Sequence, residues 1–385
     1  MTKPMDVVVV GAGPCGAVAA RSLAARGWRV ALVDRQAFPR QKVCGDALLP
    51  DALQILRSLG LADSVLAAGH RLNRISVFSP GGHEVRVSGD FLTLRREVLD
   101  ALVHRAATQL GVETVADVVS SLSESFERVR VDLRSRPPLL ARACILATGA
   151  DTRLLRSLRP AIAPAPTAVA SRCYVRSSHV IDRLVVTYDR GLGPAYAWIF
   201  PLGDGLFNVG VGSVCRSRTR FDHRSLFERF TTVFPEARAL MAAGERVSPL
   251  RSAPLRCGLD PDALRPGRLC LGAGEAAGST FPFTGEGIGK AMETGLLAAD
   301  AVHAFLGGEE RGLDSYSLAV LRLRPRYRAY STAHRLLDHP RLMDLAAWRL
   351  KRSPWLAGRL AAVLKEEADP SSLFSIAGLA GSFFR

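Results

Sequence analysis

Residues 6–34 of this chain, DVVVVGAGPCGAVAARSLAARGWRVALVD, decide its fold. The apolar run over residues 7–10 is typical of a buried parallel strand. Three glycines then form the pattern G-x-G-x-x-G, in which Gly11 permits a tight turn, Gly13 lets the backbone approach a pyrophosphate, and Gly16 lets a helix pack closely on the strand. The stretch therefore predicts a strand, a phosphate-binding turn and a helix in direct succession.

Two further features strengthen this prediction. The helix after the glycines runs to about residue 26, and its N-terminus presents free N–H groups and a positive dipole end to phosphates. A second strand over residues 28–33 ends at Asp34, which stands where an acid binds ribose hydroxyls. A glycine turn that binds nothing is the alternative, but the strand, helix and acid together favour a dinucleotide site.

Bulk properties restrict the class of protein. The 385 residues are enough for two domains, and no apolar run of about 18 residues predicts a transmembrane helix. The first predicted strand begins within a few residues of the start, so we expect no signal peptide. The seven cysteines are scattered without a C-x-x-C or Cys/His cluster, so neither a disulfide framework nor a metal site is predicted. A reducing cytoplasm is the expected compartment.

The net charge of +15 comes from 51 basic residues. Most of them are arginines spread along the chain rather than gathered in one block, and no nucleic-acid-reading motif accompanies them. We therefore do not predict a nucleic-acid partner. Weak attraction to an anionic membrane surface stays open.

The later pattern indicates that the nucleotide fold is interrupted. Buried-strand segments recur at residues 142–149 and 269–271, while residues 168–214 are typical of an antiparallel sheet. We predict an α/β fold: a Rossmann-like domain with an inserted, mainly antiparallel β-sheet domain and a helical C-terminus. Further expected elements are a loop over residues 35–50, helices over residues 51–68, 95–110 and 285–305, a hairpin over residues 74–87, and helices over much of residues 310–385. The predicted boundaries are residues 1–70, 91–165 and 260–305 for the nucleotide-binding domain, 71–90 and 166–259 for the substrate domain, and 306–385 for the C-terminal segment.

A second glycine-rich stretch, LGAGEAAGSTFPFTGEGIGKAMETG at residues 271–295, carries the next signal. Its small residues let the backbone approach a flat ligand. The predicted helix N-terminus at residues 285–288 can stabilise negative charge on that ligand. Glu275 can accept a hydrogen bond from a ribose or ribityl hydroxyl.

Together these motifs resemble the geranylgeranyl reductase family of flavoproteins, relatives of the p-hydroxybenzoate hydroxylase fold. The resemblance covers roughly residues 5–305, and the C-terminal 80 residues match no family pattern. The residues that carry it are, in chain order, Gly11-Ala12-Gly13-Pro14-Cys15-Gly16, Lys42-Val43-Cys44-Gly45, Arg96 with Leu99 and Asp100, Tyr196-Ala197-Trp198-Ile199-Phe200-Pro201, Asn208-Val209-Gly210-Val211-Gly212, and Gly274-Glu275-Ala276-Ala277-Gly278 followed by Pro282 and Gly285-Glu286-Gly287-Ile288.

The resemblance implies bound FAD, with its adenosine on the first motif and its isoalloxazine under the last. Glu275 replaces the family's aspartate, which leaves the ribityl contact in doubt, and Cys15 is expected to be a small packing residue. The cofactor-binding residues that the resemblance implies are Gly11, Gly13, Pro14, Cys15, Gly16, Asp34, Arg35, Lys42, Cys44, Gly45, Arg96, Gly274, Glu275, Pro282, Gly285, Gly287 and Ile288.

The resemblance also implies four candidate catalytic residues: Cys44, Gly45, Tyr196 and Trp198. The Cys44 thiol would orient the substrate or donate a proton, and a buried small residue in a glycine loop is the alternative. Tyr196, Trp198 and Phe200 alternate, so their side chains share one face of a strand. They either wall a pocket for an apolar substrate or are core aromatics of a sheet. Asp46, beside this loop, is expected to be structural.

The leading interpretation is an FAD-dependent reductase of a carbon–carbon double bond in an isoprenoid or other apolar substrate. No second G-x-G-x-x-G is present, so NAD(P)H would bind transiently or another reductant would supply electrons. A flavin monooxygenase that hydroxylates or epoxidises its substrate is the alternative, and a flavin halogenase is less favoured. The hydroxylases usually carry histidine after the G-D-A-A run, where this chain has Gly278. A non-enzymatic flavin-binding scaffold has little support.

The C-terminal segment interleaves tryptophans and apolar residues with arginines. Trp348 and Trp355 lie among Arg341, Arg349, Arg352 and Arg359. This spacing predicts either an amphipathic helix at a membrane surface or a helix packed on the protein itself, which we favour. The expected localisation is cytoplasmic, with peripheral membrane contact left open.

Overall fold

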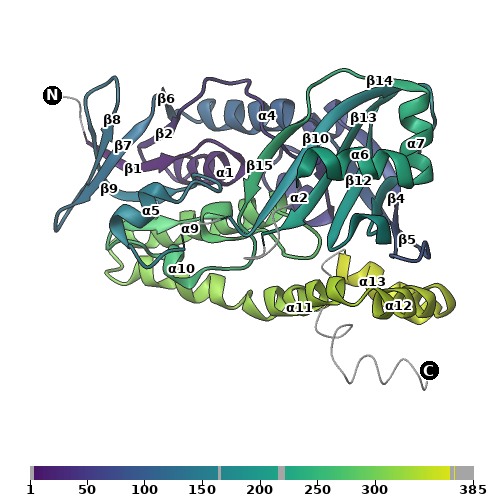
Figure 1. Cartoon of the computed structure of the whole chain (residues 1–385). Helices are drawn as coiled ribbons and strands as arrows, with labels where there is room; N and C mark the ends of the chain where they lie inside the picture. The colour runs from purple at the N-terminus through teal and green to yellow at the C-terminus, as the bar shows by residue number, and fades with distance from the viewer. Residues whose placement is uncertain (1–3, 164–165, 216–221, 365–367, 369–385) are drawn as a thin grey trace. The chain divides into compact units, whose positions relative to one another are not determined.

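A computed structural model describes residues 4–163, 166–215, 222–364 and 368 (Figure 1). The chain forms two compact units, each assembled from three separate segments. Unit 1 contains Met1–Gln41, Glu97–Pro166 and Leu255–Tyr327, and unit 2 contains Lys42–Arg96, Thr167–Pro254 and Arg328–Arg385. Each unit is built around one β-sheet.

The sheet of unit 1 is of the nucleotide-binding type. Its strand order is β6-β2-β1-β9-β8-β7, and β16 also pairs with β9. Strands β6, β2, β1, β9 and β16 are parallel, while β8 and β7 add an antiparallel extension. The middle of β1 is fully buried, as its run of valines predicts. The strands are β1 (Met5–Val10), β2 (Val30–Asp34), β6 (Glu113–Ala116), β7 (Val119–Glu124), β8 (Val129–Leu133), β9 (Leu139–Leu146) and β16 (Cys270–Gly272).

Small residues let the main helices of unit 1 pack closely. Helix α1 contacts α9, and α9 contacts α10. A Cβ atom added at Gly295 of α9 would lie 2.5 Å from the carbonyl oxygen of Cys15 in α1, so only glycine permits this approach. The helices are α1 (Pro14–Ala24), α4 (Arg96–Thr108), α5 (Arg153–Leu158), α8 (Pro261–Leu264), η2 (Gly274–Ala277), α9 (Ile288–Leu306) and α10 (Gly312–Leu321), and α11 (Arg324–Arg335) contains the boundary between the units.

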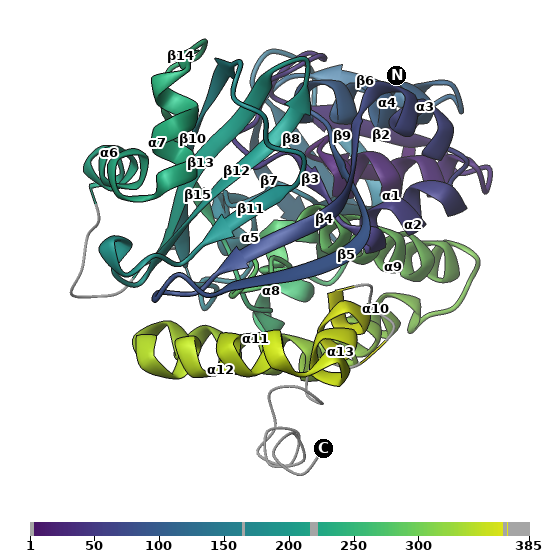
Figure 2. The ribbon, with the colours of Figure 1, turned by 90° about the vertical axis from the view of Figure 1, so that its right-hand side faces the viewer.

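The sheet of unit 2 has the strand order β14-β10-β13-β12-β11-β4-β5-β3, with β15 on β10 (Figure 2). Neighbours in this order run antiparallel, except that β11 and β4 run parallel. The predicted α/β fold class, with a second, mainly antiparallel sheet and a helical C-terminus, is confirmed. The strands are β3 (Ala47–Leu48), β4 (His70–Phe78), β5 (Glu84–Thr93), β10 (Ala168–Ser177), β11 (Leu184–Thr187), β12 (Ala195–Gly203), β13 (Leu206–Val214), β14 (Gly244–Arg246) and β15 (Arg251–Leu255).

Helices cover part of this sheet. Phe227, Phe230 and Phe234 from α6 and the loop before α7 are buried against residues of β10, β12 and β13, including Ile199 and Val209. Helices α12 and α13 pack on β5. The helices of unit 2 are α2 (Pro50–Ser58), α3 (Ala62–Ala68), η1 (Arg190–Leu192), α6 (His223–Val233), α7 (Pro235–Ala242), η3 (Leu336–Asp338), α12 (Pro340–Arg352) and α13 (Pro354–Leu364). Among the helices of the described residues, none is long and apolar enough to cross a membrane.

Three predicted elements need correction. The helix predicted over residues 51–68 is two helices, because Gly60 takes a φ of +69° and ends the first. The helix predicted from residue 285 begins at Ile288, because Gly285, at a φ of +68°, lies in a turn. The predicted loop over residues 35–50 contains the short strand β3. Part of the predicted C-terminal helical region, residues 365–367 and 369–385, lies outside the described residues.

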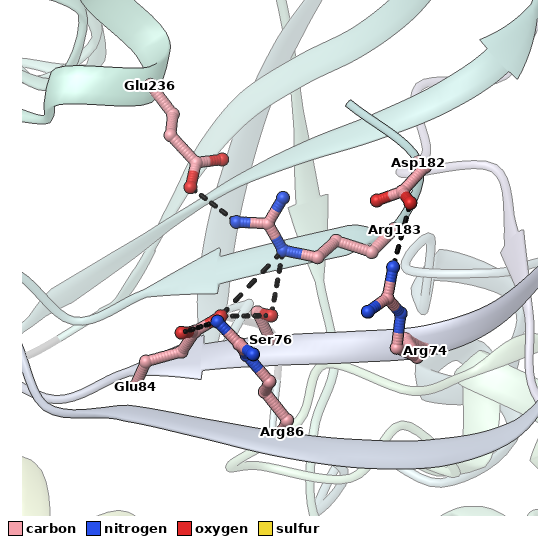
Figure 3. Close-up of polar contacts among 7 residues, drawn as sticks. All are labelled: Arg74, Ser76, Glu84, Arg86, Asp182, Arg183 and Glu236. Carbon is pink, nitrogen blue, oxygen red and sulfur yellow. Dashed lines mark hydrogen bonds and ion pairs between the residues drawn. The ribbon is translucent and has the colours of Figure 1, made fainter. Parts of the chain in front are cut away.

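Polar contacts around Arg183 link β4, β5 and α7 of unit 2 (Figure 3). The Arg183 Nε donates to Ser76 Oγ of β4 at 2.9 Å, and its Nη2 donates to Glu236 in the first turn of α7. Ser76 Oγ in turn donates to Glu84 Oε1 at 2.7 Å, and Arg86 pairs with the other Glu84 oxygen. Arg183 is thus the cation shared by two partly buried carboxylates.

We expect Arg183→Met to lower the free energy of unfolding by about 2 kcal/mol, because it leaves Glu84 and Glu236 without their shared cation. Urea denaturation measures the change. The matched variant Arg86→Met removes an exposed partner of the same Glu84 and should cost less stability than Arg183→Met does. Equal losses in the two variants would contradict a special role for Arg183.

His223, the first residue of α6, bridges two strands through hydroxyl groups. Its Nδ1 lies 2.9 Å from Ser171 Oγ of β10, and its Nε2 lies 2.9 Å from Ser213 Oγ of β13. Burial lowers the pKa of His223 below its usual value, although Asp222 opposes the shift. The ring also lines a cavity of about 990 Å³, whose lining includes no predicted site residue.

This lowered pKa predicts acid destabilisation. The contribution of His223 to the free energy of unfolding is complete above the pKa of a histidine in the unfolded chain, about 6.5. That contribution is lost as the pH falls through the lower pKa that His223 has in the folded protein. His223→Gln should therefore reduce the difference in urea midpoint between about pH 7 and about pH 5.5. The pKa of His104 is also lowered by burial. Because His104 is present in both the wild type and His223→Gln, its contribution to the pH dependence is the same in the two proteins. An unchanged difference would exclude His223 as a source of the pH dependence.

Candidate cofactor and substrate sites

The glycine turn between β1 and α1 has the geometry of a phosphate cradle. Gly11 takes a φ of +99°, and a Cβ there would lie 2.3 Å from the carbonyl oxygen of Ala147. A Cβ at Gly16 would lie 1.8 Å from the carbonyl oxygen of Gly11. Gly13 is the N-cap of α1 and brings no side chain to the first N–H groups of that helix. An anion can therefore approach the backbone at this point.

Asp34 ends β2 beside this turn, as predicted. Its Oδ2 accepts a hydrogen bond from the Ala12 N–H at 2.8 Å, and its Oδ1 accepts one from the Gln36 N–H at 3.0 Å. Each carboxylate oxygen keeps a lone pair that can accept from a ribose hydroxyl.

Arg40 adds a cation that the sequence analysis missed. Its Nη1 lies 3.4 Å from the buried Asp100 carboxylate, and its Nε lies 3.7 Å from Asp34 Oδ2. The Arg40 Nε is buried and makes no hydrogen bond within the described part of the chain. An unmet donor beside a glycine cradle and an acid fits the phosphate and ribose groups of a dinucleotide.

The second glycine-rich stretch packs against the same turn. A Cβ at Gly274 would lie 2.9 Å from Cys15 Cβ. Burial raises the pKa of the Cys15 thiol to about 12, so this thiol is a packing group. Glu275 Oε1 accepts a hydrogen bond from the Arg256 N–H at 3.3 Å, and its predicted contact to a ribityl chain stays a prediction.

The structure divides the predicted site residues between the units. Unit 1 holds the glycine turn, Asp34 and the second glycine-rich stretch, and unit 2 holds the remainder. In unit 1 are Gly11, Gly13, Pro14, Cys15, Gly16, Asp34, Arg35, Gly274, Glu275, Pro282, Gly285, Gly287 and Ile288; in unit 2 are Lys42, Cys44, Gly45, Arg96, Tyr196 and Trp198.

In unit 2 the three alternating aromatic residues of β12 form a row across β13. The strand register pairs Tyr196 with Gly212, Trp198 with Gly210 and Phe200 with Asn208. A Cβ at Gly210 would lie 2.2 Å from the Trp198 ring, and one at Gly212 would lie 2.4 Å from the Tyr196 ring. The spacing of Y-x-W-x-F therefore matches that of N-x-G-x-G because each glycine makes room for one ring.

The loop that contains Cys44 is tied to this aromatic row. Asn208 accepts a hydrogen bond from Trp198 Nε1 at 2.9 Å and donates to the Cys44 carbonyl oxygen at 2.8 Å. A Cβ at Gly45 would lie 3.1 Å from the Phe200 ring. The structure thus brings Cys44, Gly45 and Trp198 together, and Tyr196 extends the row.

Asp46 is the centre of a buried polar cluster beneath this loop. Its Oδ2 accepts hydrogen bonds from Tyr174 at 2.8 Å and Asn208 at 2.7 Å, and its Oδ1 accepts one from the Arg96 N–H at 3.1 Å. Asp46 is fully buried, and its φ of +65° is one that aspartate tolerates better than most residues. These contacts agree with the structural role expected of Asp46.

The sequence analysis also missed Arg172 and Tyr174 of β10. The register places Arg172 opposite Gly210 and Tyr174 opposite Asn208. The Arg172 guanidinium lies 4.0 Å from the centre of the Tyr174 ring, and its buried Nε makes no hydrogen bond among the described residues. The available signal was the alternation of Arg172 and Tyr174, which places both side chains on one face of β10.

Charges within the cluster oppose the effect of burial. Burial raises the pKa of the Asp46 carboxyl, while hydrogen bonds from Tyr174 and Asn208 and the charge of Arg172 lower it. Burial likewise raises the pKa of the Cys44 thiol, and the nearby Arg96 guanidinium opposes this. Cys44 is therefore held as a neutral thiol, which carries a proton at neutral pH.

Comparison with known proteins agrees with this geometry. Residues 4–139 match the family model described as an FAD binding domain. The chain is therefore a flavoprotein, and the cradle, Asp34 and Arg40 are residues that fit the adenosine and pyrophosphate of FAD. It is 34% identical over 366 residues to a menaquinone reductase of Mycobacterium tuberculosis (strain ATCC 25618 / H37Rv), across 88% of this chain and 85% of the relative. The chain belongs to the geranylgeranyl reductase family of FAD-dependent oxidoreductases.

Other similar proteins include a digeranylgeranylglycerophospholipid reductase of Methanothermobacter thermautotrophicus, 26% identical across 79% of this chain and 78% of the relative. Among solved structures, a geranylgeranyl bacteriochlorophyll reductase-like protein of Thermoplasma acidophilum has a TM-score of 0.82 at 18% identity, across 98% of both chains. A flavin-dependent brominase has a TM-score of 0.77 at 18% identity, across 99% of this chain and 98% of that one. At such identities these two structures show the fold, which serves more than one chemistry.

Proposed function

We propose that this protein is an FAD-dependent reductase that adds two hydrogen atoms across a carbon–carbon double bond of an isoprenoid chain. The observation that carries the proposal is the packing of the Cys44-Gly45-Asp46 loop on the row of Tyr196, Trp198 and Phe200. That arrangement combines a row of aromatic rings with a neutral thiol and a buried charged cluster. The proposal gains support from relatives whose names join a reductase to an isoprenoid lipid.

Each part of the arrangement has a separate role. Bound FAD, once reduced, supplies a hydride for one alkene carbon. The aromatic row offers rings against which a methyl-branched chain packs and from which water is excluded. The Cys44 thiol holds the proton that the second alkene carbon needs, and its raised pKa keeps it protonated at neutral pH. NAD(P)H or another reductant then restores the reduced cofactor.

The buried cluster favours a substrate with an electron-rich head group. Arg96 and Arg172 bring two positive charges, whereas Asp46 brings one negative charge. The Arg172 Nε is a buried donor with no hydrogen bond to any residue that the structure describes, so a carbonyl or phosphate oxygen would satisfy it. A polyprenyl quinone and a prenyl diphosphate both present such oxygens at one end of an apolar chain.

The test is a product analysis under strict exclusion of oxygen. FAD-loaded protein is reduced with dithionite and mixed with menaquinone in detergent, and in parallel with geranylgeranyl diphosphate. The extract is then reoxidised in air, which returns any menaquinol to the quinone, and mass spectrometry with fragmentation should find a product that has gained two hydrogen atoms in its isoprenoid chain. Cys44→Ala should keep its flavin but slow product formation by about a hundredfold, as loss of a general acid does, whereas Cys44→Ser should recover part of the rate.

The outcome also distinguishes the alternative chemistry. If the reduced protein yields product only with oxygen, and that product carries label from ¹⁸O₂, the protein is a monooxygenase and the reductase proposal fails. If Cys44→Ala forms product at the wild-type rate, the proton comes from another group. If neither lipid reacts under either atmosphere, the proposed isoprenoid substrate class is wrong.

A further inference from the structure

Helix α12 is held against unit 2 along one side. Ala347 packs in a cluster with Val85 and Val87 of β5, and Leu350 adds to that cluster. Asp344 accepts hydrogen bonds from Ser79 Oγ at 2.7 Å and from the Gly81 N–H, and it pairs with Arg190 at 2.9 Å. These contacts fix the rotation of α12 about its own axis, so they also fix which side chains face away from the sheet.

The outward side of α12 is apolar. Leu342 is 50% exposed, Leu345 is 51% exposed and Trp348 is 39% exposed, although side chains of this kind are usually buried. At 100° per residue these three share one side of the helix with Arg341 and Arg352, opposite the buried Met343 and Ala347. Trp355 of α13 is 41% exposed as well.

The same surface is positively charged. Residues 340–364 contain one acid, Asp344, and that acid is already paired with Arg190. The basic residues of this stretch are Arg341, Arg349, Lys351, Arg352 and Arg359. We define the α12–α13 surface as Arg341, Leu342, Leu345, Trp348, Arg352 and Trp355.

In the α12–α13 surface each tryptophan ring lies under an arginine side chain, a combination that is favourable at the interface between water and lipid. The Arg352 guanidinium lies 4.4 Å from the centre of the Trp348 ring, and the Arg359 guanidinium lies 5.7 Å from that of Trp355. Tryptophan rings prefer the headgroup level of a bilayer, and long basic side chains place their charge outward beside the lipid phosphates.

We propose that the α12–α13 surface binds an anionic lipid bilayer from one side, as an interfacial docking site. Exposed leucines and tryptophans supply the apolar contact, and Arg341 and Arg352 supply attraction to acidic headgroups. A second copy of this chain is a poorer occupant, because two such surfaces would bring like charges together. The proposal depends on this surface alone and not on the chemistry proposed for the Cys44 loop.

The test is co-sedimentation of the full, FAD-loaded chain with vesicles. One set of vesicles is pure phosphatidylcholine, and the other contains a third phosphatidylglycerol. The apolar variant is Leu342→Ser with Leu345→Ser, and the charge variant is Arg341→Gln with Arg352→Gln. The matched control is Phe126→Ser, which removes an exposed aromatic ring that also lies under an arginine, Arg268, but belongs to unit 1.

We expect the wild-type protein to bind anionic vesicles at least tenfold better than neutral ones, with the difference reduced in high salt. The apolar variant should lose at least tenfold in partitioning, and the charge variant about fivefold for each arginine. Phe126→Ser should bind as the wild type does. Tryptophan fluorescence with brominated lipid gives a second readout, since quenching should weaken in Trp348→Phe with Trp355→Phe.

Three results would overturn the proposal. The first is a wild-type protein that stays in solution with both vesicle types. The second is a pair of variants that keep wild-type flavin content and also keep wild-type partitioning. The third is vesicle-free self-association, measured by sedimentation velocity, that the same variants abolish, because it would assign the surface to a second copy.

Discussion

Gly16→Ala is expected to yield a protein that purifies without FAD. The added methyl group would lie 1.8 Å from the Gly11 carbonyl oxygen, a backbone atom that cannot yield as a flexible side chain can. Either the turn or α1 must move, and both position the N–H groups that receive the pyrophosphate. We expect FAD affinity to fall at least a hundredfold, or about 3 kcal/mol. Visible flavin absorbance per chain, followed by titration with added FAD, measures the loss.

Gly27→Ala is the control for Gly16→Ala. Gly27 also has a positive φ, +85°, but nothing lies within 4 Å of the Cβ that alanine would add. That variant should lose about 1 kcal/mol of stability and keep its flavin. A Gly16→Ala protein that retained stoichiometric FAD would show that the turn does not hold the cofactor as proposed.

Asp46→Ala is expected to be the most destabilising single change in unit 2, at about 3 kcal/mol or more. It removes the acceptor of the Tyr174, Asn208 and Arg96 hydrogen bonds and leaves the buried Arg172 without its nearby carboxylate. It also places alanine at a φ of +65°, which aspartate tolerates better. Urea denaturation of the FAD-loaded protein measures the loss.

Asp46→Asn separates charge from shape. Asparagine tolerates the same backbone conformation, and burial already raises the pKa of Asp46, which means that its charge is costly there. We therefore expect Asn to cost less than half as much as Ala. If the two variants were equally unstable, the negative charge beside Arg172 would be the main contribution. If neither lost stability, the cluster would not support the Cys44 loop.

The parts of this fold that could be predicted are those with short-range physical signals. The glycine turn, β1 and Asp34 follow from spacing and hydrophobic pattern, and the aromatic row follows from alternation along β12. The contacts that could not be predicted from the sequence join segments that are far apart in the chain. The contacts of Asp46 with Tyr174 and Asn208 span 128 and 162 residues, and one sequence carries no local trace of them.

The exact ends of helices and the position of a single basic residue such as Arg40 could not be predicted from the sequence either. Gly285 looked like the start of a helix because glycine and a following acid are common there, but its positive φ delays α9 by one turn. Arg40 lies in a loop of mixed composition, and only the fold brings it to Asp34 and Asp100. Exposure of Leu342 and Leu345 could not be read from periodicity, which gives an apolar stripe but not what covers it.

The interrupted order of the two units has a consequence for how the protein is made. Cys15, near the start of α1, is synthesised well before its packing partner Gly295 on α9, which lies about 280 residues later in the sequence. At a synthesis rate of about 5–20 residues per second, the nascent turn waits roughly 15–60 s for that helix. A chain that stalls before residue 295 therefore carries the nucleotide motif without the α9 residue that packs against α1.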